Sequence, residues 1–147
     1  MAVAAEATVK NIMIELVHTT RGEATVLDAA SVMLEKDVSC LVVMEKEGPV
    51  GMITQRDILR KVTVAHLDPG KVRVKDIMSA PLIVTSMDSS IGDAARKMIV
   101  NEIKRLVVLR EDGTMLGLVT MTDLVRWLAK EKELSDTLIN YLKYDIP

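Results

Sequence analysis

The stretch GMITQRDIL at residues 51–59 ends an apolar run with a hydroxyl, an arginine and an aspartate, and it returns as GLVTMTDLV at residues 117–125. Gly51, Thr54 and Asp57 of the first copy stand at the same spacing as Gly, Thr and Asp of the second. We call the Thr-x-x-Asp segments at 54–57 and 120–123 the two corners. A polar segment that occurs twice predicts that the chain contains an internal repeat.

The repeat extends along almost the whole chain. A shift of 65 residues carries VKNIM at 9–13 onto VKDIM at 74–78, and LVV at 41–43 onto LVV at 106–108. One extra residue in the second copy raises the shift to 66 for the corner itself. We therefore predict three segments: a first repeat at residues 8–66, a second repeat at residues 72–130 and a C-terminal helical tail at residues 133–147.

Each copy has the same predicted order of elements. Apolar residues recur at helical spacing from Val26 to Leu34 and from Ile91 to Ile99, which predicts one amphipathic helix per copy. The runs CLVVM and RLVVL each precede a turn and a second apolar run, which is typical of a two-stranded hairpin. A second helix is expected from the threonine of each corner, and a further strand is expected at LVHTT and PLIVT. The predicted fold class is α/β, of the α+β type, with two βαββα units that pack together because each is small.

Composition excludes several classes of partner. Hydrophobic residues make up 49% of the chain and charged residues 27%, as in compact globular proteins. The net charge of −2 provides no basic field for nucleic acid or an anionic membrane, and no apolar run approaches the roughly 18 residues of a membrane helix. The first residues lack a basic signal region, and the single Cys40 cannot form an internal disulfide. We expect a cytoplasmic protein that binds neither nucleic acid nor membrane.

Motifs of catalysis and metal binding are missing from the sequence. His18 and His66 are far apart and belong to no metal-ligand spacing. The chain has no GxxxxGK[ST] loop, no HExxH motif and no nucleophile with a visible base partner. We therefore expect no catalytic residues, no metal site and no catalytic cofactor, so the protein is not predicted to be an enzyme.

The repeated corner has two interpretations. Thr-x-x-Asp at a helix start is a capping box, in which each side chain binds a backbone N–H of the other residue. It also suits a ligand, because glycine lets another group approach a strand closely and a helix start favours phosphate. A carboxylate one turn into the helix would then accept the hydroxyls of a ribose. The residues of the motif leave both interpretations open.

The paired units, VKDIM, RLVVLREDG and the pattern G-h-x-T-x-x-D resemble a pair of CBS domains, the cystathionine β-synthase repeat that forms a Bateman module. The resemblance spans about residues 8–130, and TQRDILRKV is further similar to stand-alone archaeal and bacterial CBS proteins. It implies two repeats related by pseudo-two-fold symmetry, with adenine nucleotides or related adenosyl ligands bound in clefts between them.

The resemblance also implies a set of ligand-binding residues. The aspartates Asp57 and Asp123 would hold the ribose, and the threonines Thr54 and Thr120 would lie near the phosphate. Residues near the base would be the strand ends Thr20 and Thr85 and the residues that lead into the hairpins, Val38 and Ile103.

Basic residues distinguish the two predicted sites. Arg105, and also Arg56, would reach the phosphate of the Asp57 site, unless they are solvated surface arginines. The Asp123 site has Thr122 in place of Arg56. Charged contacts to phosphate are stronger than neutral ones, so we predict that phosphorylated ligands prefer the Asp57 site.

The implied function is a regulatory module for energy sensing, with AMP as ligand and ADP or ATP as further candidates. The nucleotide would act as a regulatory ligand, and its occupancy would rearrange the repeats or a dimer and reach an unknown protein effector. A homodimer is expected through the second helices, around DILRKV and DLVRWL, with Trp127 at that contact or in the core of its own chain. The alternatives are a scaffold without nucleotide and a binder of S-adenosylmethionine or NAD.

Overall fold

The structure is a computed structural model, and it describes residues 7–131. The predicted C-terminal tail lies outside the described residues. The elements in chain order are a 3-10 turn (Val9–Asn11), β1 (Thr19–Thr20), α1 (Val26–Lys36), β2 (Cys40–Glu45), β3 (Gly48–Thr54), α2 (Gln55–Ile58) with a π-helix (Leu59–Thr63), α3 (Val74–Ile77), β4 (Val84–Ser86), α4 (Ile91–Val100), β5 (Arg105–Leu109), β6 (Met115–Thr120) and α5 (Met121–Glu131).

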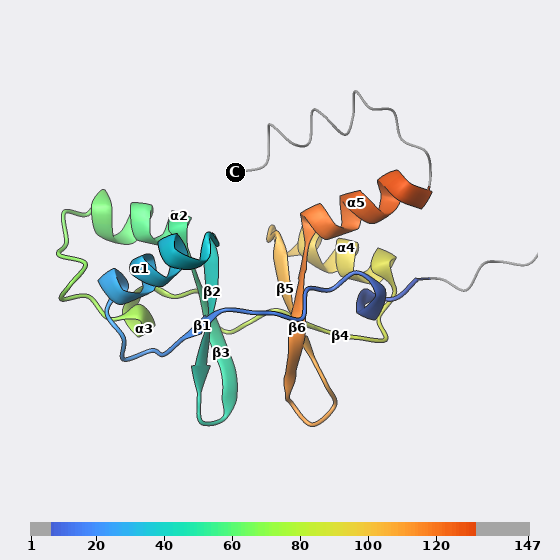
Figure 1. The fold of residues 1–147 in the computed structure, drawn as a ribbon, viewed down its shortest axis with the longest axis horizontal. Helices are drawn as coiled ribbons and strands as arrows, with labels where there is room; N and C mark the ends of the chain where they lie inside the picture. The colour runs from blue at the N-terminus through green and yellow to red at the C-terminus, as the bar shows by residue number, and fades with distance from the viewer. Residues whose placement is uncertain (1–6, 132–147) are drawn as a thin grey trace, which may run out of the picture. The chain divides into compact units, whose positions relative to one another are not determined.

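The predicted order of strand, helix, strand, strand and helix is confirmed in both copies, and with it the α/β class (Figure 1). Each copy forms a three-stranded sheet, in the orders β1-β2-β3 and β4-β5-β6. The first strand of each sheet is short and runs parallel to the second, as the pairing of Thr85 with Val108 shows. The hairpin strands β2 and β3, like β5 and β6, are antiparallel.

The first helix of each copy begins at a hydroxyl cap. Thr25 Oγ1 accepts a hydrogen bond from Asp28 N at 3.1 Å, and Ser90 Oγ accepts one from Asp93 N at 3.0 Å. The helices end where Asp37 and Glu102 adopt left-handed conformations, with φ of 52° and 53°. Local sequence therefore determines where α1 and α4 begin and end.

The core of the unit Leu16–Ile83 lies between one face of its sheet and its helices. Figure 1 shows α1 and α2 on the same side of this sheet. Alternation along the strands turns Leu41, Val43 and Ile53 toward the helices. The buried members of this core are Val26, Ala29, Met33, Leu41, Val43, Ile53, Val62, Val74 and Ile77.

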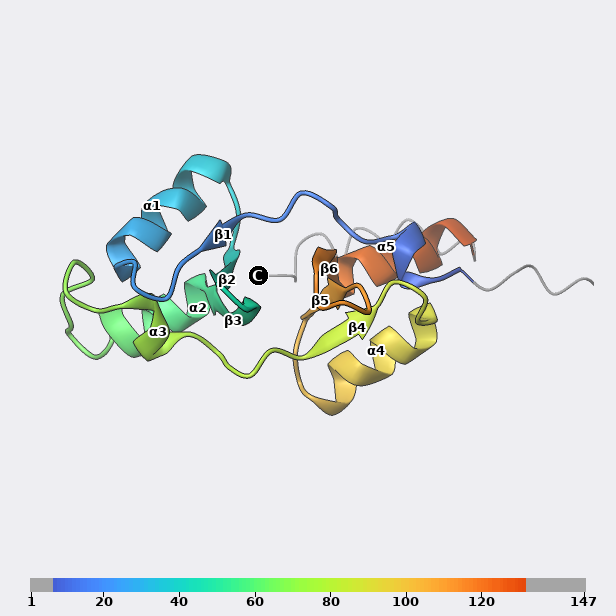
Figure 2. The same ribbon diagram turned by 90° about the horizontal axis from the view of Figure 1, so that it is seen from below.

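The two compact units of the chain do not follow the repeats. One unit is Leu16–Ile83, and the described part of the other is residues 7–15 with residues 84–131. VKDIM, which leads into the second repeat, packs in the first of these units, where Val74 and Ile77 are buried (Figure 2). Val74 N donates to Ala24 O at 2.9 Å and fixes the segment there.

VKNIM, which leads into the first repeat, packs in the other unit in the same way. Val9 is fully buried, and its N–H donates to Ser89 O at 2.9 Å. Ile14 and Leu118 exchange two backbone hydrogen bonds, of 2.8 and 2.9 Å. Each lead-in segment therefore packs in the unit that the other repeat builds.

Candidate functional site

Both Thr-x-x-Asp corners are complete capping boxes. Thr54 Oγ1 accepts from Asp57 N at 3.1 Å, and Asp57 Oδ2 accepts from Thr54 N at 2.9 Å. The same two bonds at the second corner measure 3.2 and 2.9 Å, between Thr120 and Asp123. The capping interpretation is confirmed for both corners, and the residues of the motif therefore define where α2 and α5 begin.

Capping occupies only one oxygen of each carboxylate. Asp57 Oδ2 also accepts from Thr54 Oγ1 at 3.0 Å, so two donors already fill that oxygen. Within residues 7–131, the ion pair of Asp57 Oδ1 is with the Lys61 ammonium, at 3.6 Å. Among residues 7–131, Asp123 makes no ion pair at all. Each corner thus retains an oxygen that can accept hydroxyl donors, and capping is compatible with ligand binding.

The threonine hydroxyls are also committed. Thr54 and Thr120 each donate their hydroxyl proton to the aspartate, at 3.0 and 2.8 Å, while they accept from its backbone N–H. A hydroxyl has one donor. Donation to a phosphate oxygen would therefore require the hydroxyl to rotate away from the carboxylate, which would release Oδ2 for a second ribose hydroxyl.

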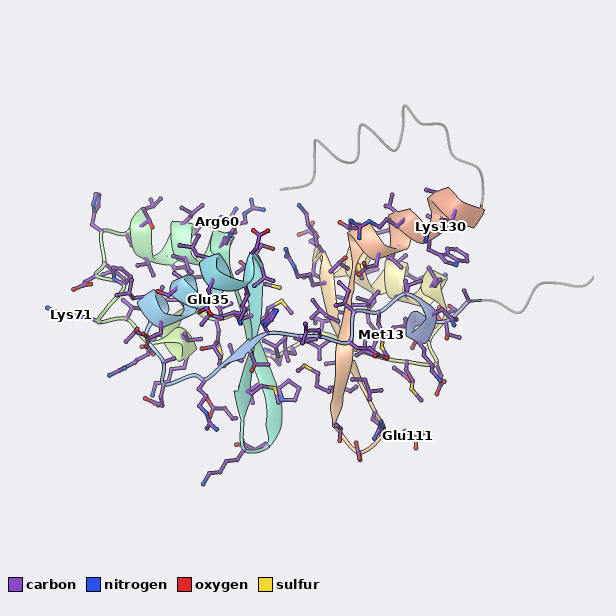
Figure 3. All side chains as sticks on the ribbon, viewed as in Figure 1. Met13, Glu35, Arg60, Lys71, Glu111 and Lys130 are labelled. Atoms are coloured by element: carbon purple, nitrogen blue, oxygen red, sulfur yellow. The ribbon has the colours of Figure 1, made fainter. Side chains whose placement is uncertain are left out.

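The glycines of the motif make room for the lead-in segments. A Cβ added to Gly117 would lie 2.5 Å from Ile14 O, and one added to Gly51 would lie 2.6 Å from Met78 Sδ. Figure 3 shows Met13, whose sulfur is close to Gly117, on the segment that runs beside β6. The close approach that glycine permits is confirmed, and the nearest group is the Ile14 backbone at Gly117 and the Met78 side chain at Gly51.

The residue opposite the threonine differs between the two corners. Cys40 pairs with Thr54 across the β2–β3 ladder, and Arg105 pairs with Thr120 across the β5–β6 ladder. Directly opposed residues point to the same face of a sheet. Arg105 is half-buried beside the second corner of its own unit, and Arg56 is exposed on the first turn of α2. A role of either arginine at a phosphate stays a prediction.

Residues predicted near the base lie at the same edges of the two sheets. Thr20 pairs with Val43, and Thr85 pairs with Val108 and is only 5% exposed. Val38 and Ile103 are half-buried and directly follow the left-handed residues that end α1 and α4. The part of these four side chains in binding also stays a prediction.

Lys61 is a site residue that the sequence interpretation missed. Its ammonium lies 3.6 Å from Asp57 Oδ1 and donates to Ile77 O at 2.8 Å. The spacing of four residues between aspartate and lysine on a helix is a local signal that could have indicated the pair. Lys61 is therefore the nearest cation to the first corner.

The described part of the chain contains neither a metal-binding cluster nor a membrane-spanning helix. No three His, Cys, Asp or Glu side chains of residues 7–131 gather so that they could hold a metal ion. None of the helices in this range combines the length and the apolar character needed to cross a bilayer.

Comparison with known proteins identifies the family. The model of the CBS domain matches residues 9–64 and 74–130. The CBS domain-containing protein YhcV of Bacillus subtilis is 32% identical over 79% of this chain and 81% of its own. The uncharacterized protein MK0525 of Methanopyrus kandleri is 35% identical over 69% of this chain, which spans about half (53%) of that relative's length.

A solved structure has the same fold. The CBS domain pair of protein MJ0100, in complex with 5′-methylthioadenosine and S-adenosyl-L-methionine, aligns with a TM-score of 0.78 at 24% identity. The alignment covers 87% of this chain and all of that one (100%). The two matched repeats, their shared fold and the paired Thr-x-x-Asp corners show that the chain belongs to the CBS domain family, as a CBS domain pair.

Proposed function

We propose that the chain is a regulatory module that binds an adenine nucleotide at its Thr-x-x-Asp corners and carries out no catalysis. AMP is the first candidate ligand, and ADP and ATP are the next. The proposal rests on the different roles of the two carboxylate oxygens of each aspartate. Oδ2 of Asp57 and of Asp123 caps a helix, whereas Oδ1 stays open to hydroxyl donors. A ribose diol is such a donor pair.

The proposed contacts of the remaining parts of the ligand rest on the resemblance to CBS domains. Arg56 and Arg105 are the proposed phosphate contacts of the Asp57 site, because ionised hydrogen bonds are the stronger ones. Thr54 and Thr120 would contact phosphate after rotation of their hydroxyls. The proposed contacts of the base are Thr20, Thr85, Val38 and Ile103.

Another adenosyl ligand is the second candidate. The CBS pair of MJ0100 holds 5′-methylthioadenosine and S-adenosyl-L-methionine, which share adenosine with AMP and have no phosphate. S-adenosylmethionine and NAD therefore belong among the ligands to be tested. A scaffold without ligand is the third candidate, since helix capping accounts for the hydrogen bonds between Thr54 and Asp57.

Titration calorimetry with AMP, ADP, ATP, S-adenosylmethionine and NAD tests the proposal. We expect AMP to bind, and we expect Asp57→Ala to weaken AMP binding by about tenfold, because the ribose loses a charged acceptor. Asp123→Ala is the matched variant, since it removes the same capping bonds from the other corner. We expect it to have the smaller effect on AMP.

Two results would contradict the proposal. Absence of binding at millimolar concentrations of all five ligands would leave the scaffold as the function. A greater loss of AMP affinity from Asp123→Ala than from Asp57→Ala would reverse the order of the two sites. The melting temperature with and without ligand is a rapid first measurement, because a ligand that binds only the native state raises it.

We propose that ligand occupancy is transmitted to an unknown protein effector through a homodimer formed by the second helices. Leu59 is 57% exposed and Leu128 is 37% exposed on these helices. Charge at such a contact opposes association, so Leu59→Glu is expected to yield monomers in sedimentation equilibrium. Leu34→Glu is the matched control, because Leu34 is 82% exposed on the first helix, α1. If Leu34→Glu yields monomers and Leu59→Glu does not, the dimer contact is formed by α1 and not by the second helices.

A further inference from the structure

Lys61 connects the first corner to the lead-in segment of the same unit. Its ammonium lies 3.6 Å from Asp57 Oδ1, and it donates at 2.8 Å to Ile77 O, at the end of α3. An ammonium group has three donors, and the bond to Ile77 uses one of them. The Lys61 side chain is 45% exposed and that of Asp57 is 14% exposed, so the lysine side chain is more accessible to solvent than the aspartate.

The second corner has no such cation on its helix. The shift of 66 residues that superimposes the two corners places Trp127 at the position of Lys61. Trp127 is half-buried, and within the described residues Asp123, only 8% exposed, makes no ion pair. The two corners therefore share hydroxyl, carboxylate and cap geometry and differ in the cation beside them: Lys61 lies near the Asp57 carboxylate, whereas Arg105 lies opposite Thr120 of the second corner.

The charge difference affects phosphorylated and unphosphorylated ligands differently. Both kinds of ligand offer ribose hydroxyls to Oδ1, but only a phosphorylated one brings a second anion close to the carboxylate. Repulsion between the two anions weakens binding unless a cation lies near both. Lys61 lies 3.6 Å from the carboxylate and keeps donor hydrogens that a phosphate oxygen beside it could accept.

We propose that Lys61 contributes to ligand specificity, so that the Asp57 corner favours a phosphorylated adenosyl ligand over an unphosphorylated one. This inference rests on the proposed function, and it assigns a ligand class to the first corner. Lys61 also competes weakly with the ribose for Oδ1, at 3.6 Å, so its removal leaves the nucleoside bound as well or slightly better.

The test compares AMP with adenosine, which differ only in the phosphate. In the Asp123→Ala chain, which retains the Asp57 corner alone, Lys61→Met is expected to lower AMP affinity about fivefold and to leave adenosine within about twofold. The difference should shrink as salt is added, because ions screen an exposed charge. Lys71→Met is the control for net charge, because Lys71 lies on the exposed loop before α3 (Figure 3) and is expected to change neither affinity.

The reciprocal variant tests whether the cation alone is sufficient. In the Asp57→Ala chain, Trp127→Lys places a lysine four residues after Asp123, and we expect the preference for AMP over adenosine to rise. Equal weakening of both ligands by Lys61→Met, or no change in either, would overturn the inference and leave AMP binding as proposed. Failure of both ligands to bind the unsubstituted chain would instead refute the proposed function.

Discussion

Val74→Ala is expected to lower the free energy of unfolding of the unit Leu16–Ile83 by about 2.5 kcal/mol. Val74 is fully buried in that unit's core, so loss of its two methyl groups leaves a cavity in the core. The residue belongs to the lead-in of the second repeat, but its contacts lie in the unit of the first. Amide hydrogen exchange measures where protection is lost.

Protection should fall in β2 and β3 and persist in β5 and β6. The matched variant is Val9→Ala, since Val9 is equally buried and precedes the first repeat. It should produce the opposite pattern, with loss in β5 and β6, because Val9 N donates to Ser89 O. Loss of protection in β5 and β6 after Val74→Ala would mean that each lead-in packs with its own repeat in solution.

Local periodicity accounts for what could be predicted of the fold. The 3.6-residue spacing from Val26 onward and the β-branched run after Cys40 depend on neighbours within a few residues, and both gave the observed elements. The Thr54 and Asp57 cap is equally local, because its partners are three residues apart. Predictions of this kind need no knowledge of tertiary contacts.

The packing of each lead-in segment in the unit of the other repeat could not be predicted. A segment of five residues such as VKDIM does not indicate which of the two sheets it packs near. Met52 and Ser79 exchange two backbone hydrogen bonds although they lie far apart in sequence. The π-helix at Leu59–Thr63 was also missed. Its hydrogen bonds span one more residue than those of an α-helix, and an apolar pattern of nine residues is too short to distinguish the two. The second copy continues as an ordinary α-helix there, in α5.

The candidate site could also be predicted only in part. Repetition of Thr and Asp predicted a ligand-binding position, but the spacing carries no information on which carboxylate oxygen the cap occupies. In the structure Oδ2 of Asp57 accepts the capping bonds, and Oδ1 faces Lys61. Lys61 donates to Ile77 O, which belongs to a lead-in segment 16 residues further along the chain. Tertiary contact of this kind is not encoded in the spacing of the motif.

Gly117→Ala is expected to have the largest effect on stability, a loss of about 4 kcal/mol. The added Cβ would lie 2.5 Å from Ile14 O, which is backbone and cannot turn aside as a side chain can. Overpacking of this kind costs about 1–3 kcal/mol, and displacement of Ile14 also breaks its two hydrogen bonds with Leu118, at about 1 kcal/mol each. Denaturant unfolding measures the change.

Two further glycines calibrate the result of Gly117→Ala. Gly51→Ala should cost less, because the added Cβ first meets Met78 Sδ, a flexible side chain, and lies 3.0 Å from Ser79 O. Gly92→Ala should be neutral or stabilising by up to about 1 kcal/mol, since its nearest atom is Ser90 Oγ at 3.9 Å and alanine favours a helix. Equal losses of stability from Gly92→Ala and Gly117→Ala would refute the close packing of the Ile14 backbone against Gly117. The predicted order of cost, Gly117 above Gly51 above Gly92, follows from what each new Cβ meets: backbone, side chain or open space.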